Sequence, residues 1–348
     1  MKRVWPIPGV LAAVLIVAFL LLRAPDTDAA AMRAKYGGPP SQFVTLSDGP
    51  TVHYRDEGPR DAPVLVLLHG SNADLHTWQP WVDRLKGRYR LIRFDQRGHG
   101  LTGAAAGGYD ADAFARDVLH LADALKLDRF VLAGNSMGGA NAARFAMLHP
   151  ERLAGLVLID AGGAPVKREG GGNLAFTVLR LPVIGPLASK VMQRTLVERS
   201  LRQSVANQAI VTPAAIDRYW ELARYPGNRQ ATRERFALPW TGFTAAQVEK
   251  IAVPTLVMWG EEDSLIPLAA AGWWRARLPD VRLVSYPGIG HLPMEEAPDR
   301  SAADLARFVA ALPLSPGPRS QSVVKPVASE TGLLQPRRLT IRDEGSQP

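Results

Sequence analysis

Residues 132–139 read LAGNSMGG, and they place Ser136 in a glycine-rich turn directly after a run of aliphatic residues. The stretch fits the pattern Gly-x-Ser-x-Gly, which lifts a nucleophilic serine above a sheet edge when it lies between a strand and a helix. The turn is so sharp that side chains at the flanking positions would collide with nearby backbone, so glycine is required there. The alternative is a small polar residue in an ordinary turn, and the rest of the chain must decide between the two.

The segments around this turn alternate between strand-like and helix-like patterns. Short apolar runs predict strands buried on both faces at 64–68, 89–95, 129–134, 153–160, 254–260 and 281–286. Helical periodicity covers roughly 74–86, 110–126, 137–149, 267–278 and 300–311. A β-hairpin with its turn at Asp48-Gly49-Pro50 precedes them. This alternation predicts an α/β fold with a doubly wound, mostly parallel sheet.

One interval interrupts the alternation. Residues 164–248 contain no strand-like run and include helix-compatible segments such as NLAFTVLRL and PAAIDRYWELARY. An insertion of this kind, placed before the strand at 254–260, predicts a helical cap over the carboxyl edge of the sheet. We therefore expect a domain over residues 41–313 with a cap at about 164–248.

Composition excludes several classes of protein. The chain has no cysteine, so disulfides, thiolate metal sites and cysteine catalysis are excluded. Of the formal charge of +8, residues 1–40 carry +3 and residues 314–348 carry +2, which leaves +3 for the large middle region. No basic stripe is interleaved with aromatic residues, so we expect no nucleic-acid partner. No His-Glu-x-x-His spacing occurs, and we expect neither a metal nor a cofactor.

The two ends of the chain differ from the middle. Lys2 and Arg3 precede WPIPGVLAAVLIVAFLLL (5–22), which predicts a membrane anchor with the folded body on the periplasmic or extracytoplasmic side. A cleaved signal peptide and secretion are the alternative, since Ala29 and Ala31 form a small-x-small pattern. Residues 1–40 are thus expected to form an anchor or signal segment and a linker. Residues 314–348 are rich in Pro, Ser and Gly and predict a disordered tail.

A nucleophilic serine needs a base and an acid that orients the base. His291 follows the last predicted strand, so it would lie on a loop at the same sheet edge as Ser136. Asp263 in WGEEDSLIP follows the strand at 254–260, and the order Ser136, Asp263, His291 is that of α/β-hydrolase triads. Asp160, at the end of the preceding strand, is the alternative acid.

An oxyanion hole is predicted on the loop after the first core strand. In Leu68-His69-Gly70-Ser71-Asn72 the glycine lets the chain turn, and the backbone N–H groups of Ser71 and Met137 would point at a substrate carbonyl oxygen. We expect His69 to support this loop rather than transfer protons. His76, His120 and His149 lie within or at the ends of helical patterns.

Taken together, the motifs HGSNADLHTW, FDQRGHG, GNSMGG, WGEEDSLIP and GIGHLPMEEAP occur in the order of the α/β-hydrolase superfamily, which the chain resembles over about residues 42–312. The resemblance implies that Ser136, Asp263 and His291 form the triad. It also implies that FDQRGHG, with Asp95, Arg97 and His99, is a structural loop, and that Glu296 braces the histidine loop.

Several activities occur within this superfamily. A serine nucleophile counts against dehalogenases and epoxide hydrolases, which use a carboxylate. GNSMGG is similar to carbon–carbon bond hydrolases of ring-fission products, but HGSNAD and Leu292 depart from their pattern. The N-terminal apolar segment, GxSMGG and the GH-x-P loop resemble membrane-anchored monoacylglycerol lipases and bacterial lipases. We therefore expect hydrolysis of lipophilic acyl esters, with a carbon–carbon hydrolase, a cofactor-free haloperoxidase-like activity and a non-catalytic binding protein as alternatives.

Overall fold

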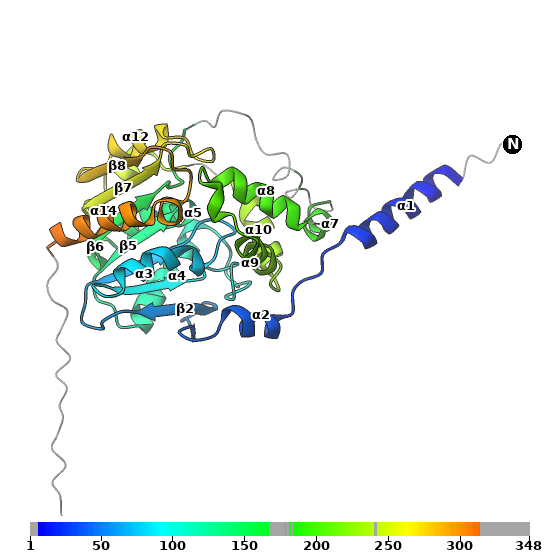
Figure 1. Ribbon diagram of the computed structural model, residues 1–348, viewed down its shortest axis with the longest axis horizontal. Coiled ribbons are helices and arrows are strands. Elements are labelled where there is room, and N and C mark those ends of the chain that lie inside the picture. The colour runs from blue at the N-terminus through cyan, green and yellow to red at the C-terminus, as the bar shows by residue number, and fades with distance from the viewer. Residues whose placement is uncertain are drawn as a thin grey trace, which may run out of the picture. The chain divides into compact units, whose positions relative to one another are not determined.

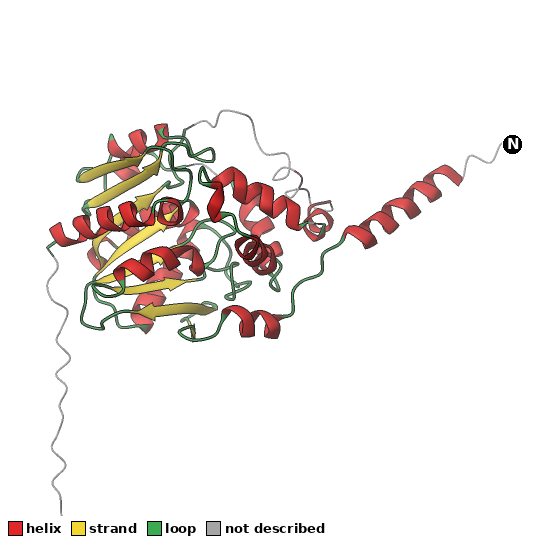
Figure 2. Cartoon of the chain, viewed as in Figure 1, coloured by secondary structure: helices red, strands yellow, loops and turns green. Residues whose placement is uncertain are grey.

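The centre of the fold is an eight-stranded sheet with the strand order β1-β2-β4-β3-β5-β6-β7-β8 (Figures 1 and 2). The computed structural model describes residues 6–166, 178, 181, 184–191, 193–239 and 242–313. The strands are β1 Gln42–Thr45, β2 Thr51–Glu57, β3 Val64–Leu68, β4 Arg90–Phe94, β5 Phe130–Asn135, β6 Leu153–Ile159, β7 Thr255–Gly260 and β8 Val281–Tyr286. Each of the six predicted core strands is present within a residue or two of its expected limits.

The sheet is antiparallel at one edge and parallel elsewhere. β1 and β2 form the predicted hairpin, and β2 pairs antiparallel with β4. From β4 through β8 every pairing is parallel. The chain order reverses at β3, which lies between β4 and β5. Ligands of open α/β sheets bind outside the carboxyl ends of the strands at such a reversal, which here is where the turn at Ser136 lies.

Helices cover both faces of the parallel sheet, as Figure 2 shows. The sequence of β3 is apolar without a break because both faces of the strand are buried. Leu65 and Leu67 pack on one face, and Val66 and Leu68 pack on the other. The first face is covered by α3 (Gln79–Leu85) and α14 (Pro298–Ala311). The second is covered by α4 (Ala111–Ala124), α5 (Met137–Leu148) and α12 (Ala269–Arg275). The predicted doubly wound α/β architecture is therefore confirmed.

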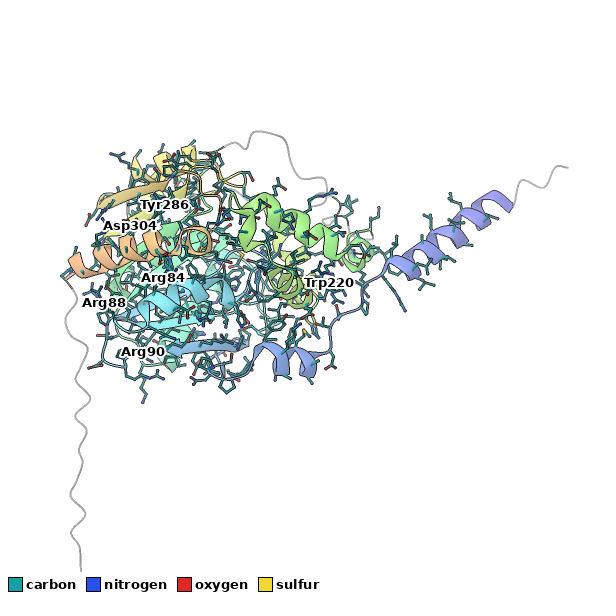
Figure 3. All side chains as sticks on the ribbon, viewed as in Figure 1. Arg84, Arg88, Arg90, Trp220, Tyr286 and Asp304 are labelled. Atoms are coloured by element: carbon teal, nitrogen blue, oxygen red, sulfur yellow. The ribbon has the colours of Figure 1, made fainter. Side chains whose placement is uncertain are left out.

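Polar contacts fix the helices on the first face. Tyr286 at the end of β8 donates its hydroxyl to Asp304 of α14 at 2.9 Å, and the two labelled side chains meet between strand and helix in Figure 3. Trp81 of α3 donates its indole N–H to Ser301 of α14 at 2.8 Å. Both pairs are buried, so each satisfies polar groups that burial would otherwise penalise.

A helical cap is inserted between β6 and β7, as predicted. Its described elements are α7 (Ile184–Lys190), α8 (Arg194–Ser204), the short η3 (Gln208–Ile210), α9 (Pro213–Ala223), α10 (Asn228–Ala237) and α11 (Ala245–Val248). α9 corresponds to the predicted PAAIDRYWELARY segment; Thr212 caps its N-terminus and Pro213 occupies its first turn. The predicted NLAFTVLRL segment lies almost wholly outside the described residues, as does the predicted tail at 314–348.

The N-terminal region differs from a simple anchor and linker. The apolar run forms α1 (Pro6–Leu22), yet within the described part of the chain no helix is both long and apolar enough to cross a membrane. The expected transmembrane anchor is therefore not supported. Part of the predicted linker forms α2 (Ala29–Tyr36), in which Met32 packs against Leu222 and Tyr225 of the cap region.

Candidate active site

Ser136 lies at a strained turn between β5 and α5. Its φ of 55° and ψ of −117° fall in a region that L-residues rarely occupy, and such strain typically costs about 1–3 kcal/mol. The flanking glycines explain how the turn is possible. A Cβ on Gly134 would lie 2.2 Å from the carbonyl oxygen of Gly138, and one on Gly138 would lie 2.2 Å from that of Leu68. The sequence motif therefore adopts the nucleophile-elbow geometry.

Asp263 and His291 meet on the loops after β7 and β8. The Nδ1 atom of His291 is 2.7 Å from an Oδ2 atom of Asp263, and both residues are buried. The other carboxylate oxygen of Asp263 accepts backbone N–H groups from Leu265 and Ile266 at 2.7 and 3.0 Å. This arrangement fixes the carboxylate, and it places the proton of the imidazole on Nδ1 so that Nε2 is the free base.

The histidine loop is joined directly to the serine turn. The side-chain amide of Asn135 donates to the carbonyl oxygen of His291 at 3.0 Å and to that of Ile159 at 3.2 Å. Asn135 is buried, and it is the residue immediately before Ser136. The Asn135 side chain therefore joins the turn that carries the nucleophile to the loop that carries the base. The sequence pattern does not predict this hydrogen bond.

The cap also holds the histidine loop. The backbone N–H of His291 donates to Ser204 at the end of α8 at 2.8 Å. The carboxylate of Glu296 accepts N–H groups from Ala206 and Asn207 of the cap, and from Gly290 and Leu292 on either side of the histidine, at 2.8–3.2 Å. Glu296 thus braces the histidine loop, as the family resemblance implies, and joins it to the cap as well.

Asp160, the alternative acid, has a different environment from Asp263. One of its oxygens accepts the N–H of Gly260 at 2.9 Å, and the other is buried without a donor among the described residues. Burial, followed by the charge of Asp263, raises the pKa of Asp160 well above its ordinary value. The environment of Asp160 therefore favours its protonated form, whereas Asp263 contacts the histidine.

Asp160, Asp263 and His291 also form a group whose potential metal-ligand atoms lie within 4.8 Å of one another. Within this group Asp263 binds two N–H groups and the imidazole, and one oxygen of Asp160 accepts the N–H of Gly260.

The predicted oxyanion loop follows β3 and lies against the serine turn. A Cβ on Gly70 would be 3.2 Å from the Cβ of Ser136. Ser71 and Met137 are partly exposed, and within the described residues no acceptor binds their backbone N–H groups. His69 donates from Nδ1 to the carbonyl of Gly70 at 2.7 Å, and burial lowers its pKa, so the ring is neutral and supports the loop.

The FDQRGHG segment forms a buried loop beside this site. Asp95 accepts the backbone N–H groups of Leu75 and Leu101, both at 2.8 Å, and Arg97 binds the carboxylate of Asp117 through two contacts of 2.7 Å. His99 donates from Nδ1 to the carbonyl of Arg97 at 2.9 Å. These contacts agree with the structural role that the family resemblance implies.

Comparison with known proteins agrees with this geometry. The family model of the α/β hydrolase fold matches residues 63–298, and the chain therefore belongs to the α/β-hydrolase fold family. With its elbow, histidine loop and cap, it is a hydrolase of that family.

Proteins similar to this chain differ from one another in the activity that their names give. The chain is 34% identical over 274 residues to a non-heme chloroperoxidase of Streptomyces lividans, covering 76% of this chain and 98% of that protein. It is 30% identical over 280 residues to a bifunctional esterase/perhydrolase of Acinetobacter calcoaceticus, covering 77% and 99%. A solved structure of a bacterial membrane phospholipase A is similar with a TM-score of 0.64 and 27% identity, covering 87% and 95%.

Proposed function

We propose that the chain is a serine hydrolase that cleaves carboxylic esters with lipophilic acyl groups. The observation that carries the proposal is the strained Ser136 turn, tied through Asn135 to a histidine that is itself bonded to Asp263. The similarity to an esterase/perhydrolase and to a membrane phospholipase A supports the ester substrate class.

In the proposed reaction His291 removes the proton of Ser136 as the serine oxygen attacks the ester carbonyl. Asp263 holds the imidazole in the required tautomer and stabilises its charged form. The backbone N–H groups of Ser71 and Met137 bind the oxyanion of the tetrahedral intermediate; one such donor typically contributes about 3 kcal/mol. His291 then protonates the leaving alcohol, and water hydrolyses the acyl-enzyme.

A lipid ester substrate agrees with the N-terminal segment. We propose that α1 keeps the chain at a lipid surface on the extracytoplasmic side, because nine of its large apolar side chains between Val10 and Leu22 are at least 50% exposed. Removal of the segment at Ala31 would cut through α2 and would delete Asp26, which binds Arg229 of the cap. Recovery of the protein in the soluble fraction, with its N-terminus near Met32, would contradict this proposal.

The ester substrate is tested by comparing turnover of 4-nitrophenyl esters of graded chain length with turnover of a ring-fission dienoate. We expect hydrolysis of the esters, with kcat/KM rising from acetate to a medium-chain acyl group. A clear preference for the dienoate would instead assign the chain to carbon–carbon bond hydrolysis. Halogenation or peracid formation that exceeds ester hydrolysis would favour the haloperoxidase-like alternative.

A further inference from the structure

Arg235 of the cap helix α10 reaches down to the predicted oxyanion loop. Its Nη2 atom donates to the hydroxyl of Ser71 at 2.7 Å and lies 3.4 Å from the side-chain oxygen of Asn72. Its Nη1 atom lies 2.6 Å from Nε2 of His99. The guanidinium has more N–H groups than these contacts use, so donors remain for a further acceptor.

The same helix also contributes to a hydrophobic cluster near Met137. Ala231 lies one turn before Arg235, and it belongs to a buried cluster with Tyr109 and Phe114 against which Met137 packs. Ser71 and Met137 supply the two proposed oxyanion donors. α10 therefore bonds to Ser71 through Arg235 and contributes Ala231 to the cluster against which Met137 packs, so the guanidinium lies on the predicted oxyanion loop.

The charge of Arg235 has no acidic partner among the described residues. Ser71 and Asn72 are neutral, and burial together with Arg235 itself lowers the pKa of His99 well below its ordinary value. His99 is therefore an uncharged acceptor at Nε2. Burial lowers the pKa of Arg235 to about 10, so the guanidinium remains charged at neutral pH. A partly desolvated charge of this kind is costly without a counterion.

Four other cap arginines bind carboxylates, whereas Arg224 donates to the backbone carbonyls of Trp220 and Pro25. Carboxylates bind each of the following: Arg194 with Asp217, Arg202 with Glu198, Arg218 with Asp74, and Arg229 with Asp26. Arg235 is the arginine of this cap region that faces the oxyanion loop, and its bonds go to neutral groups.

We propose that Arg235 binds an anionic group of the substrate beside the ester carbonyl, so that the preferred substrates are acyl esters carrying a carboxylate or a phosphate. The inference rests on the proposed ester hydrolysis and names its substrate class. A guanidinium matches both groups, since either can accept two parallel N–H bonds. The carboxylate could lie on the acyl group, and the phosphate on the alcohol.

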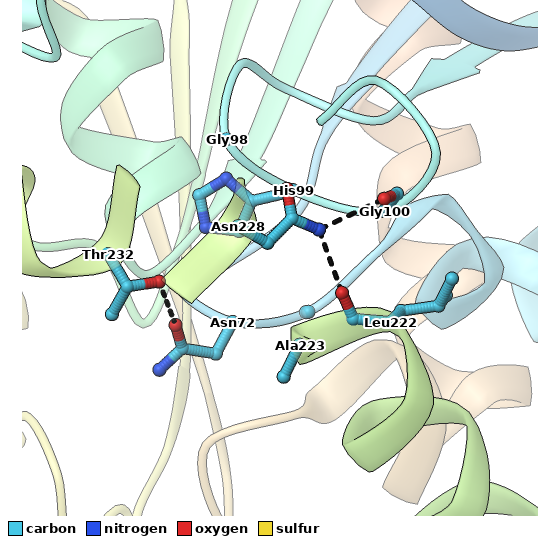
Figure 4. A pocket seen from close by; sticks show the side chains of 9 residues that line it. Asn72, Gly98, His99, Gly100, Leu222, Ala223, Asn228 and Thr232 are labelled. Atoms are coloured by element: carbon cyan, nitrogen blue, oxygen red, sulfur yellow. Dashed lines mark hydrogen bonds between the residues drawn. The ribbon is translucent and has the colours of Figure 1, made fainter. Parts of the chain in front are cut away.

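A small cavity next to Arg235 does not account for its charge. It lies between α9, α10 and the loops that carry Asn72 and His99, and Figure 4 shows Thr232 bonded to Asn72 at its edge. Its volume of about 10 Å³ is close to that of one water molecule. The anionic group is therefore assigned to the remaining N–H groups of Arg235 and not to this space.

The proposal is tested with two matched pairs of esters. In the first pair, 4-nitrophenyl butyrate is neutral and mono-4-nitrophenyl glutarate carries an acyl-side carboxylate. In the second, monobutyrylglycerol is neutral and butyryl-glycerol 3-phosphate carries an alcohol-side phosphate. We expect Arg235→Met to lower kcat/KM for at least one anionic ester about 10- to 100-fold more than for its neutral partner. The pair of esters whose anionic member loses more turnover in the variant shows whether Arg235 binds a carboxylate or a phosphate.

Two controls separate this role from others. Arg199→Met removes one charge from an exposed position on α8, and it should change both members of a pair equally. If Arg235→Met lowers turnover of neutral and anionic esters equally, the guanidinium only braces the oxyanion loop and the proposal is wrong. A thermal melt confirms that the variant is folded.

Binding of glutarate and glycerol 3-phosphate by calorimetry is a readout that does not need turnover. We expect the wild-type chain to bind at least one of them about tenfold or more tightly than Arg235→Met. Equal binding, or no binding to the wild-type chain, overturns the anion site. Absence of ester hydrolysis together with intact, Arg235-dependent binding would instead overturn the proposed reaction and leave the anion site standing.

Discussion

Replacing Asp160 by asparagine should change how the stability of the protein depends on pH. Asp160 is fully buried, and Gly260, Asp263 and Glu296 are the groups that act on its pKa most directly. Burial and the two negative charges raise this pKa, while the hydrogen bond from Gly260 opposes them. An asparagine can accept the same bond and donate to Asp263 from its amide, so the variant should fold.

The number of protons that Asp160 binds in the folded and unfolded states determines how the free energy of unfolding changes with pH. An unfolded aspartate has a pKa of about 3.9, whereas the folded chain keeps the proton on Asp160 at higher pH. Between the two pKa values the folded state holds one more proton than the unfolded state. The free energy of unfolding therefore loses about 1.4 kcal/mol per pH unit from this group over the pH range between those two pKa values.

Asp160→Asn removes this contribution because its amide does not titrate. We expect the free energy of unfolding of the variant, minus that of the wild-type chain, to rise by about 1.4 kcal/mol per pH unit over this range. Urea unfolding of the full chain, followed by tryptophan fluorescence at several pH values, measures the difference. Glu249→Gln, at an exposed position, is the control for a change in net charge. A difference that stays flat would show that Asp160 is ionised in the folded protein.

Three further substitutions test contacts around the site. Asn135→Ala removes the bond to the His291 carbonyl, worth about 1 kcal/mol, and should lower kcat roughly fivefold with little change in KM; an equal fall in thermal stability and no change in kcat would contradict the positioning role. Glu296→Ala leaves four backbone N–H groups without their acceptor, and we expect at least about 3 kcal/mol of destabilisation in urea, against a smaller loss for Glu296→Gln. Gly138→Ala would place a Cβ 2.2 Å from the carbonyl of Leu68, so a variant that folds and reacts normally would refute the described elbow.

Much of the sheet could be predicted because its strands are buried on both faces. β3 and β6 consist almost entirely of aliphatic residues, as expected of strands with both faces buried. α9 was predictable for a local reason as well, since Thr212 and Pro213 mark its start. The elbow followed from Gly134 and Gly138, because a Cβ on Gly134 would meet the backbone of Gly138 in the same turn, and a Cβ on Gly138 would meet the end of β3.

Other features of the site depend on contacts between segments that are distant in the sequence, and no local sequence pattern predicts these contacts. The bond from Asn135 to His291 spans more than 150 residues of sequence. Arg235 lies in a helix whose sequence, NRQATRERFA, is polar and does not reveal which arginine faces the site. The packing of Met32 on the cap was missed because the segment after an apolar N-terminus resembles a linker.

The most direct test of the proposed chemistry is covalent labelling of the full chain with a fluorophosphonate, followed by peptide mass spectrometry. We expect one labelled residue, Ser136, with labelling abolished in Ser136→Ala and strongly slowed in His291→Ala, where the base is missing. Equal labelling of the wild-type chain and Ser136→Ala, or no labelling of a folded wild-type chain, would contradict it.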